Sequence, residues 1–126
     1  MEEKDFVSRK EAGQRAQTPF GELVWKMAAD TMDGAEMTFG TCMIEPGKRN
    51  PLHSHPDCEE ILYLLKGRCE HLLGDELISM GEGDAIRIPR GVRHWAKNVG
   101  DEPLLALIAF SSGVRTAINH EGEGAA

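Results

Sequence analysis

The sequence lacks any long apolar segment that could enter a membrane. Its longest uninterrupted apolar run is LLALIAF at residues 104–110, far short of the roughly 20 residues that a membrane-spanning helix needs. Residues 1–17 mix acidic and basic side chains and contain no hydrophobic centre of the kind found in secretion signals. We therefore expect a cytoplasmic protein with no membrane partner.

Cysteine and basic residues are also scarce. The three cysteines, Cys42, Cys58 and Cys69, form an odd set at irregular spacing, which favours free thiols over a disulfide framework. The chain has 14 Lys and Arg against 21 Asp and Glu, which gives a net charge of −7. Because an acidic chain has no general attraction to phosphate backbones, we expect no nucleic-acid partner.

What the sequence does contain is a series of short apolar segments separated by turn-forming residues. At 126 residues the chain fits one domain, and we find no internal repeat. Many short strands at such spacing predict an all-β sandwich or barrel. We predict strands at residues 23–28, 37–44, 61–66, 69–73, 77–80, 85–88, 93–99 and 104–110.

The two ends of the chain depart from this pattern. Residues 8–16 could form a short helix capped by Ser8 or an extended arm, and the last seven residues should fray because they have no apolar anchor. We therefore expect an N-terminal arm at 1–20, a barrel at 21–115 and a flexible C-terminal tail at 116–126. Inside the barrel, five consecutive apolar residues at 61–65 predict a strand buried on both faces.

The segment HSHPDCEE at 53–60 concentrates metal-binding side chains. In a strand, His53 and His55 would point to the same face, because alternate residues share a face. The following turn would return Glu60 beside them, and His94 lies just after a second, rigid turn. Three imidazoles and one carboxylate suit one divalent transition metal per chain, namely Fe, Mn, Ni, Cu or Zn.

Two stretches of the chain resemble the paired motifs of the cupin superfamily. Residues 47–67 match G-x5-H-x-H-x4-E-x6-G, and residues 83–98 match G-x5-P-x-G-x2-H-x3-N, with all signature positions filled. The resemblance implies a single-domain, cupin-type jelly-roll β-barrel of the small monocupin kind, and a homodimer. It also implies that the metal ligands are His53, His55, Glu60 and His94. Four protein ligands would leave two positions of a six-coordinate ion for water, dioxygen or a substrate oxygen.

Three residues near these ligands have competing interpretations. Glu59 competes with Glu60 because the family tolerates three or four intervening residues, but the six-residue spacing to Gly67 favours Glu60. Cys58 could offer a thiolate ligand, or it could lie in the turn with its thiol directed away. Asn98 could be a ligand, although a side chain that closes a turn is the preferred interpretation.

The surroundings of the ion can also be predicted. An apolar cavity inside the barrel would be lined by the ligands, Leu62, Leu64 and some of Met37, Phe39, Thr41 and Met43. Trp95 should point to the opposite face of its strand from His94, and we expect it to pack between sheets or against another subunit. We interpret His71 and His120 as surface residues. A group of basic residues could steer an anionic substrate or be merely solvated: Lys66, Arg87, Arg90 and Arg93.

Three functional hypotheses follow. The first is an enzyme acting on a small organic molecule that chelates the metal through oxygen, since similar cupins include dioxygenases, decarboxylases and isomerases. The second is a non-catalytic module that binds or senses a small molecule, and the third is a purely structural metal site. Neither the reaction nor a general base can be assigned from the residues. Phe6 and Val7 offer an arm that could cross to the partner of the expected homodimer.

Overall fold

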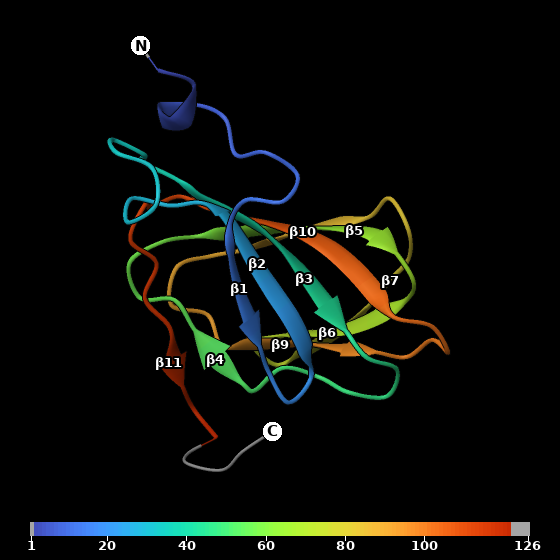
Figure 1. Cartoon of the computed structure of the whole chain (residues 1–126). Coiled ribbons are helices and arrows are strands. Elements are labelled where there is room, and N and C mark those ends of the chain that lie inside the picture. The colour runs from blue at the N-terminus through green and yellow to red at the C-terminus, as the bar shows by residue number, and fades with distance from the viewer. Residues whose placement is uncertain (1, 122–126) are drawn as a thin grey trace.

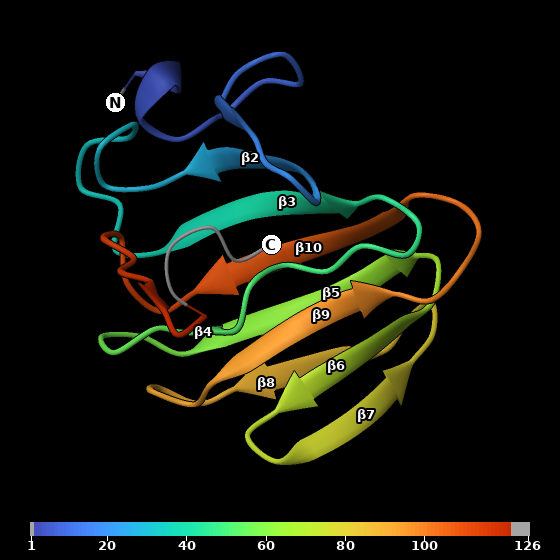
Figure 2. The ribbon, with the colours of Figure 1, turned by 90° about the horizontal axis from the view of Figure 1, so that it is seen from below.

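The computed structural model describes residues 2–121, which form two antiparallel sheets that face each other (Figures 1 and 2). The larger sheet has the strand order β1-β2-β3-β10-β5-β8, and the smaller has the order β11-β4-β9-β6-β7. This arrangement confirms the predicted all-β cupin jelly roll. The strands are β1 Gln14–Gln17, β2 Gly21–Met27, β3 Thr38–Ile44, β4 His53–Ser54, β5 Glu60–Lys66, β6 Cys69–Leu73, β7 Glu76–Met80, β8 Ala85–Ile88, β9 His94–Asn98, β10 Leu104–Phe110 and β11 Ile118–Asn119.

Helical structure is nearly absent from the described residues. Its one instance there is a 3-10 turn, η1, at Glu3–Asp5, and within residues 2–121 no helix has the length and apolarity to cross a bilayer. The helix considered for residues 8–16 does not form, because residues 14–17 pair with β2 as strand β1 instead. All eight predicted strands are present, with ends that differ by no more than two residues.

The C-terminal segment folds back onto the barrel. Its strand β11 pairs with β4, and the His120 amide donates a hydrogen bond of 2.9 Å to the carbonyl of Leu52. Both features lie inside the stretch that the sequence suggested would be flexible, while residues 122–126 lie outside the described part of the chain. The boundaries at residues 20 and 115 stay a prediction.

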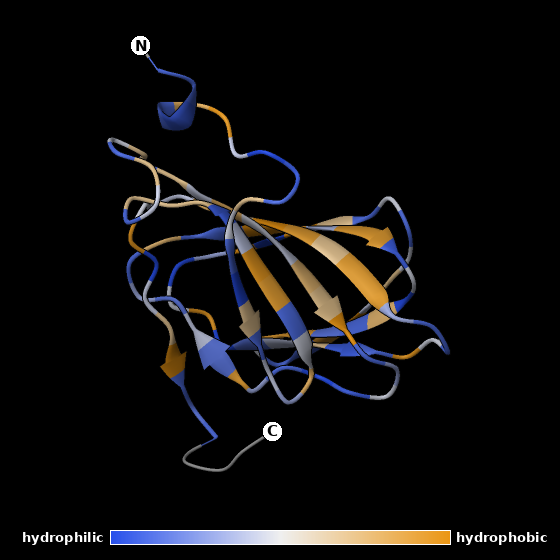
Figure 3. Cartoon of the chain, in the orientation of Figure 1, coloured by the Kyte–Doolittle hydropathy of each residue, from blue (hydrophilic) through white to orange (hydrophobic). Residues whose placement is uncertain are grey.

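One face of the larger sheet packs inward and the other is open. Along β10, alternate residues from Leu104 to Phe110 are buried, and Figure 3 shows this strand as one of the most hydrophobic. In β5, Leu62 and Leu64 are buried, whereas the three apolar residues between and beside them are 40–49% exposed. The prediction that residues 61–65 are buried on both faces is therefore wrong, because nothing in residues 2–121 covers the outer face of β5.

Strand β3 turns toward the core the side chains opposite to those that we predicted to line the cavity. Cys42 and Ile44 are buried, whereas Phe39 is exposed. The register pairs Ile44 with the buried Leu104, which fixes the face that each residue takes. The predicted lining role is therefore wrong for Met37, Phe39, Thr41 and Met43.

Asn98 closes a turn, as preferred from the sequence. Its side chain is fully buried, and its amide nitrogen donates hydrogen bonds to the carbonyls of Ile44 at 2.9 Å and Glu102 at 2.8 Å. Its side-chain oxygen accepts a hydrogen bond from the Gly100 amide. The backbone of Asn98 also accepts a hydrogen bond from Gly47, whose φ of +78° is one that side-chain-bearing residues rarely adopt.

Candidate metal centre

The four predicted ligands come from both sheets and meet between them. His53 on β4 lies directly opposite His94 on β9 in the smaller sheet. Glu60 is the first residue of β5 in the larger sheet, and His55 lies in the loop between β4 and β5. The carbonyl of His55 accepts a hydrogen bond from the Gly91 amide, so the turn of the second motif fixes the position of the first.

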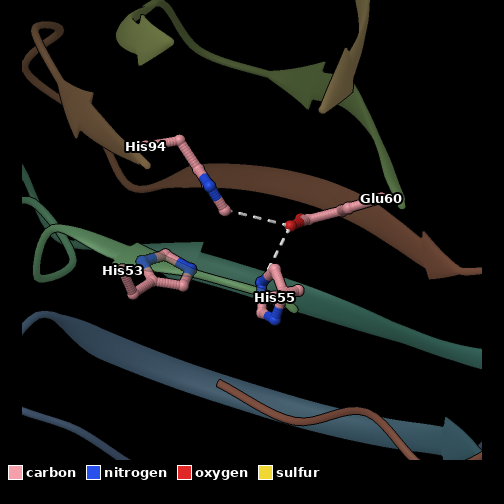
Figure 4. A group of neighbouring side chains, drawn as sticks. All are labelled: His53, His55, Glu60 and His94. Atoms are coloured by element: carbon pink, nitrogen blue, oxygen red, sulfur yellow. Dashed lines mark ion pairs between the residues drawn. The ribbon is translucent and has the colours of Figure 1, made fainter. Parts of the chain in front are cut away.

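The ligand atoms are close enough to share one ion. All four lie within 4.8 Å of one another, and Glu60 Oε1 is 3.3 Å from Nε2 of both His55 and His94 (Figure 4). These three atoms are buried, yet none has a hydrogen-bond partner among the described residues. Buried polar atoms without partners are rare and costly, and a single cation at the centre would satisfy all three. The residues present therefore fit a transition metal.

Backbone carbonyls fix the orientation of each imidazole. The Nδ1 atom of every one of these histidines faces a carbonyl oxygen at 2.6–2.9 Å, which requires Nδ1 to carry the proton and donate it. The lone pair of each ring is then on Nε2, and this is the arrangement that metal-bound histidines need. The pairs are His53 with Pro51, His55 with Thr116 and His94 with Val92.

The charge states also match metal binding. Burial and, to a smaller extent, the neighbouring His94 lower the pKa of His53 to about 4, although the Pro51 carbonyl opposes the shift. Burial alone would raise the pKa of Glu60, but the adjacent rings of His55 and His94 outweigh it and hold this pKa below its usual value. Near neutral pH the cluster therefore offers a neutral imidazole at His53 and an ionised carboxylate, the forms that bind a metal.

An apolar cavity of about 240 Å³ opens beside the cluster. Its wall includes His53, His55 and Glu60 together with side chains from β2, β5 and β10. A space of this size suits a molecule of a few carbon atoms rather than a polymer. The apolar part of the lining includes Phe20, Leu23, Trp25, Leu62, Ile108 and Phe110.

The competing residues lie outside the cluster. Glu59 is directed outward, with a side chain 42% exposed and an ion pair of 2.8 Å to Arg87, so it is Glu60 that faces the histidines. Cys58 is buried but is not among the clustered ligand atoms. Trp95 is half-buried on β9, where the guanidinium of Arg49 lies 5.3 Å from its ring centre.

The sequence interpretation missed two residues near the site. The prediction that His71 lies at the surface is wrong, because it is 1% exposed and its ring stacks on that of His94 at a centroid distance of 5.9 Å. His71 lies two residues from both Cys69 and Leu73 on β6, so it shares their face of the strand, and this alternation could have predicted its burial. Arg115, which no sequence motif indicates, also lines the cavity. His120 is half-buried, with Nε2 2.7 Å from the hydroxyl of Ser54.

The jelly roll and its His3Glu cluster define a small β-barrel with a site suited to one transition metal. The chain belongs to the cupin family, because the Cupin domain model matches residues 40–110. Germin-like protein 3-8 of Oryza sativa subsp. japonica is 35% identical over 103 residues, which cover 74% of this chain and 45% of that protein. The chain spans about half the length of the curated relatives it matches.

Solved structures share the same fold. A recombinant oxalate oxidase in complex with glycolate superposes with a TM-score of 0.76 and 25% identity, covering 90% of this chain and 62% of that one. The oxalate decarboxylase of Bacillus subtilis, a protein with Mn(II) centres, superposes with a TM-score of 0.77 and 20% identity, covering 85% and 30%. At such identities these structures establish the fold, while activity has to be argued from the site.

Proposed function

We propose that this protein is a metal-dependent enzyme that acts on a small organic molecule bound to the metal through oxygen. The observation that carries the proposal is the set of three buried, unpartnered ligand atoms on His55, Glu60 and His94, beside an apolar cavity. A structural site is normally closed by tightly held ligands on all sides, whereas this cluster adjoins a space that a substrate can enter.

Each part of the chain has a defined task in this proposal. His53, His55, Glu60 and His94 would hold the ion, which when bound would act as a Lewis acid or as a site for dioxygen. The backbone carbonyls that accept hydrogen bonds from the imidazoles would keep the rings in position. The apolar cavity wall would exclude water and orient the carbon skeleton of the substrate. Mn(II) is the first metal to test, since Mn(II) centres occur in a protein of the same fold.

The test begins with metal analysis of protein purified without chelators. Mn(II)-loaded protein would then be incubated with a panel of small hydroxy, keto and carboxylic acids, while oxygen uptake, carbon dioxide release and proton NMR spectra are followed. We expect about one metal ion per chain and turnover of at least one compound, both lost in Glu60→Gln and retained in Glu59→Gln. Tight binding of a compound without any product would instead favour the second hypothesis, a binding or sensing module.

We also propose that two copies of the chain form a dimer through the outer face of the larger sheet. Ile61, Tyr63 and Leu65 on β5 and Phe39 on β3 are 37–49% exposed. Such a continuous set of exposed apolar side chains is characteristic of interaction surfaces. Phe6 and Val7 in the N-terminal segment are likewise 55% and 41% exposed and are available to a partner. The cytoplasmic location stays a prediction.

A further inference from the structure

Arg115 is the cavity residue that the metal cluster does not explain. It lies in the segment between β10 and β11 and lines the same cavity as His53, His55 and Glu60. Its guanidinium carbon is 4.2 Å from the ring centre of Trp25 and 5.4 Å from that of Phe110. Stacking on two aromatic rings holds a guanidinium in place while leaving its N–H edge free to bind an acceptor.

No carboxylate forms an ion pair with this guanidinium within the described residues, and Glu60 and Asp57 act on its charge only through space. Four other arginines pair with an acidic side chain: Arg9, Arg15, Arg49 and Arg87. Arg115 is half-buried and has no such ion pair in residues 2–121. An arginine keeps its charge under all ordinary conditions, and a charge removed from water without a partner is unfavourable. A cavity ligand with an anionic group would supply the missing partner.

The segment that carries Arg115 is fixed to the metal site. The carbonyl of the next residue, Thr116, accepts a hydrogen bond of 2.8 Å from Nδ1 of His55, and the Thr116 hydroxyl donates a hydrogen bond of 2.7 Å to Asp57. The ring of Phe110 lies 5.0 Å from the ring of His55 and also contacts Arg115. The positive group and the metal ligands are therefore held in one frame, with the ring of Phe110 next to both.

We propose that Arg115 binds a carboxylate of a small organic acid whose other end coordinates the metal. This assignment rests on the proposed function and narrows its substrate class to acids with two oxygen-bearing ends. A planar guanidinium can bind a carboxylate through two parallel hydrogen bonds, and the cavity that Arg115 shares with His53, His55 and Glu60 has room for a few carbon atoms.

The experiment compares diacids with their monoamides on Mn(II)-loaded protein. Malonate and succinate keep a carboxylate for each site, whereas malonamate and succinamate keep one carboxylate for the metal and present a neutral amide to Arg115. Affinities would be measured by isothermal titration calorimetry for the wild type, Arg115→Gln, Arg115→Lys and Arg68→Gln. Arg68 is exposed and outside the cavity, so Arg68→Gln makes the same change in net charge elsewhere.

We expect at least one diacid to bind the wild type about 10- to 100-fold more tightly than its monoamide, as a charge-assisted pair predicts. Arg115→Gln should abolish that ratio, Arg115→Lys should keep part of it and Arg68→Gln should leave it intact. Mn(II) content and melting temperature, measured on all four proteins, report whether the site and the fold survive.

Three results would overturn the assignment. The first is an unchanged ratio in Arg115→Gln, and the second is the absence of a diacid preference, or of diacid binding, in the wild type with Mn(II) bound. Either would reject the role of Arg115 and leave the metal centre standing. The third is a wild type that binds no metal, which would reject the proposed function and this assignment together.

Discussion

The two adjacent glutamates provide a direct test of the metal centre. Glu60 faces three histidines and Glu59 faces solvent beside Arg87, so Glu60→Gln and Glu59→Gln remove the same charge at neighbouring positions. An amide can donate a hydrogen bond to an imidazole nitrogen, so metal-free Glu60→Gln should fold normally. What Glu60→Gln should lose is the added stability that the metal confers.

The size of that loss can be estimated. A ligand present at 100 times its dissociation constant stabilises the folded state by about 2.7 kcal/mol. The entropy of unfolding is about 2.1 cal/mol/K per residue, or about 0.26 kcal/mol/K for a chain of 126 residues. Mn(II) should therefore raise the melting temperature of the wild type and of Glu59→Gln by about 10 °C, and that of Glu60→Gln by much less.

The assay is thermal unfolding followed by circular dichroism, with Mn(II) or with a chelator, at one protein concentration. The quantity compared is the metal-induced shift in melting temperature of each protein, so a change in the intrinsic stability of a variant cancels. Equal shifts in Glu60→Gln and Glu59→Gln would refute the idea that Glu60 is a ligand. No shift in the wild type with Mn(II), Fe(II), Ni(II), Cu(II) or Zn(II) would refute the centre itself.

Three further outcomes are expected. Asn98→Ala removes three hydrogen bonds from a fully buried side chain and should cost about 3 kcal/mol, seen as a melting temperature about 10 °C lower with metal binding retained. Burial lowers the pKa of His71 from 6.5 to about 4, so the unfolded state takes up this proton first as the pH falls. The metal-free protein should then lose up to about 3 kcal/mol from this residue between pH 6.5 and 4, and His71→Leu should flatten that slope in thermal melts. Tyr63→Glu should convert a dimer to a monomer in sedimentation without changing circular dichroism, whereas a wild type that sediments as a monomer would reject the proposed dimer.

Most strands could be predicted because each has a local pattern. Apolar runs closed by Gly, Pro or Asp placed eight of the eleven strands. The strand β1 has the sequence QRAQ and β11 has IN, and such short polar segments have no periodicity to read. They become strands because β2 and β4 offer an unpaired edge beside them.

The sequence was less informative about which side of a strand faces inward. β3 and β5 carry apolar residues on both faces, so the sequence alone does not show which face is buried. In β3 the phase follows from pairing with β10, and in β5 the outer apolar residues remain exposed in the single chain. Burial of both faces would require another protein chain against the outer face, such as the partner subunit proposed above.

The cluster was predictable because a metal restricts which residue types and spacings are useful. The spacing of the two motifs predicts His53, His55, Glu60 and His94 as the ligands, and these four converge. Arg115 follows no motif, because a guanidinium can reach a carboxylate from many backbone positions. Its relation to the site appears only when β11 pairs with β4.

That pairing makes the C-terminal segment part of the site rather than an appendage. The carbonyl of Thr116 fixes the tautomer of His55, and Arg49 forms an ion pair with Glu121 at the other end of the segment. Arg115 directly precedes the first of these attachments, and its side chain lies against Trp25. The seven residues 115–121 thus orient a metal ligand and place a positive charge at the cavity. If Arg115 binds a substrate carboxylate as proposed, a change in how this segment packs would alter both the metal ligands and the recognition of the substrate's charge.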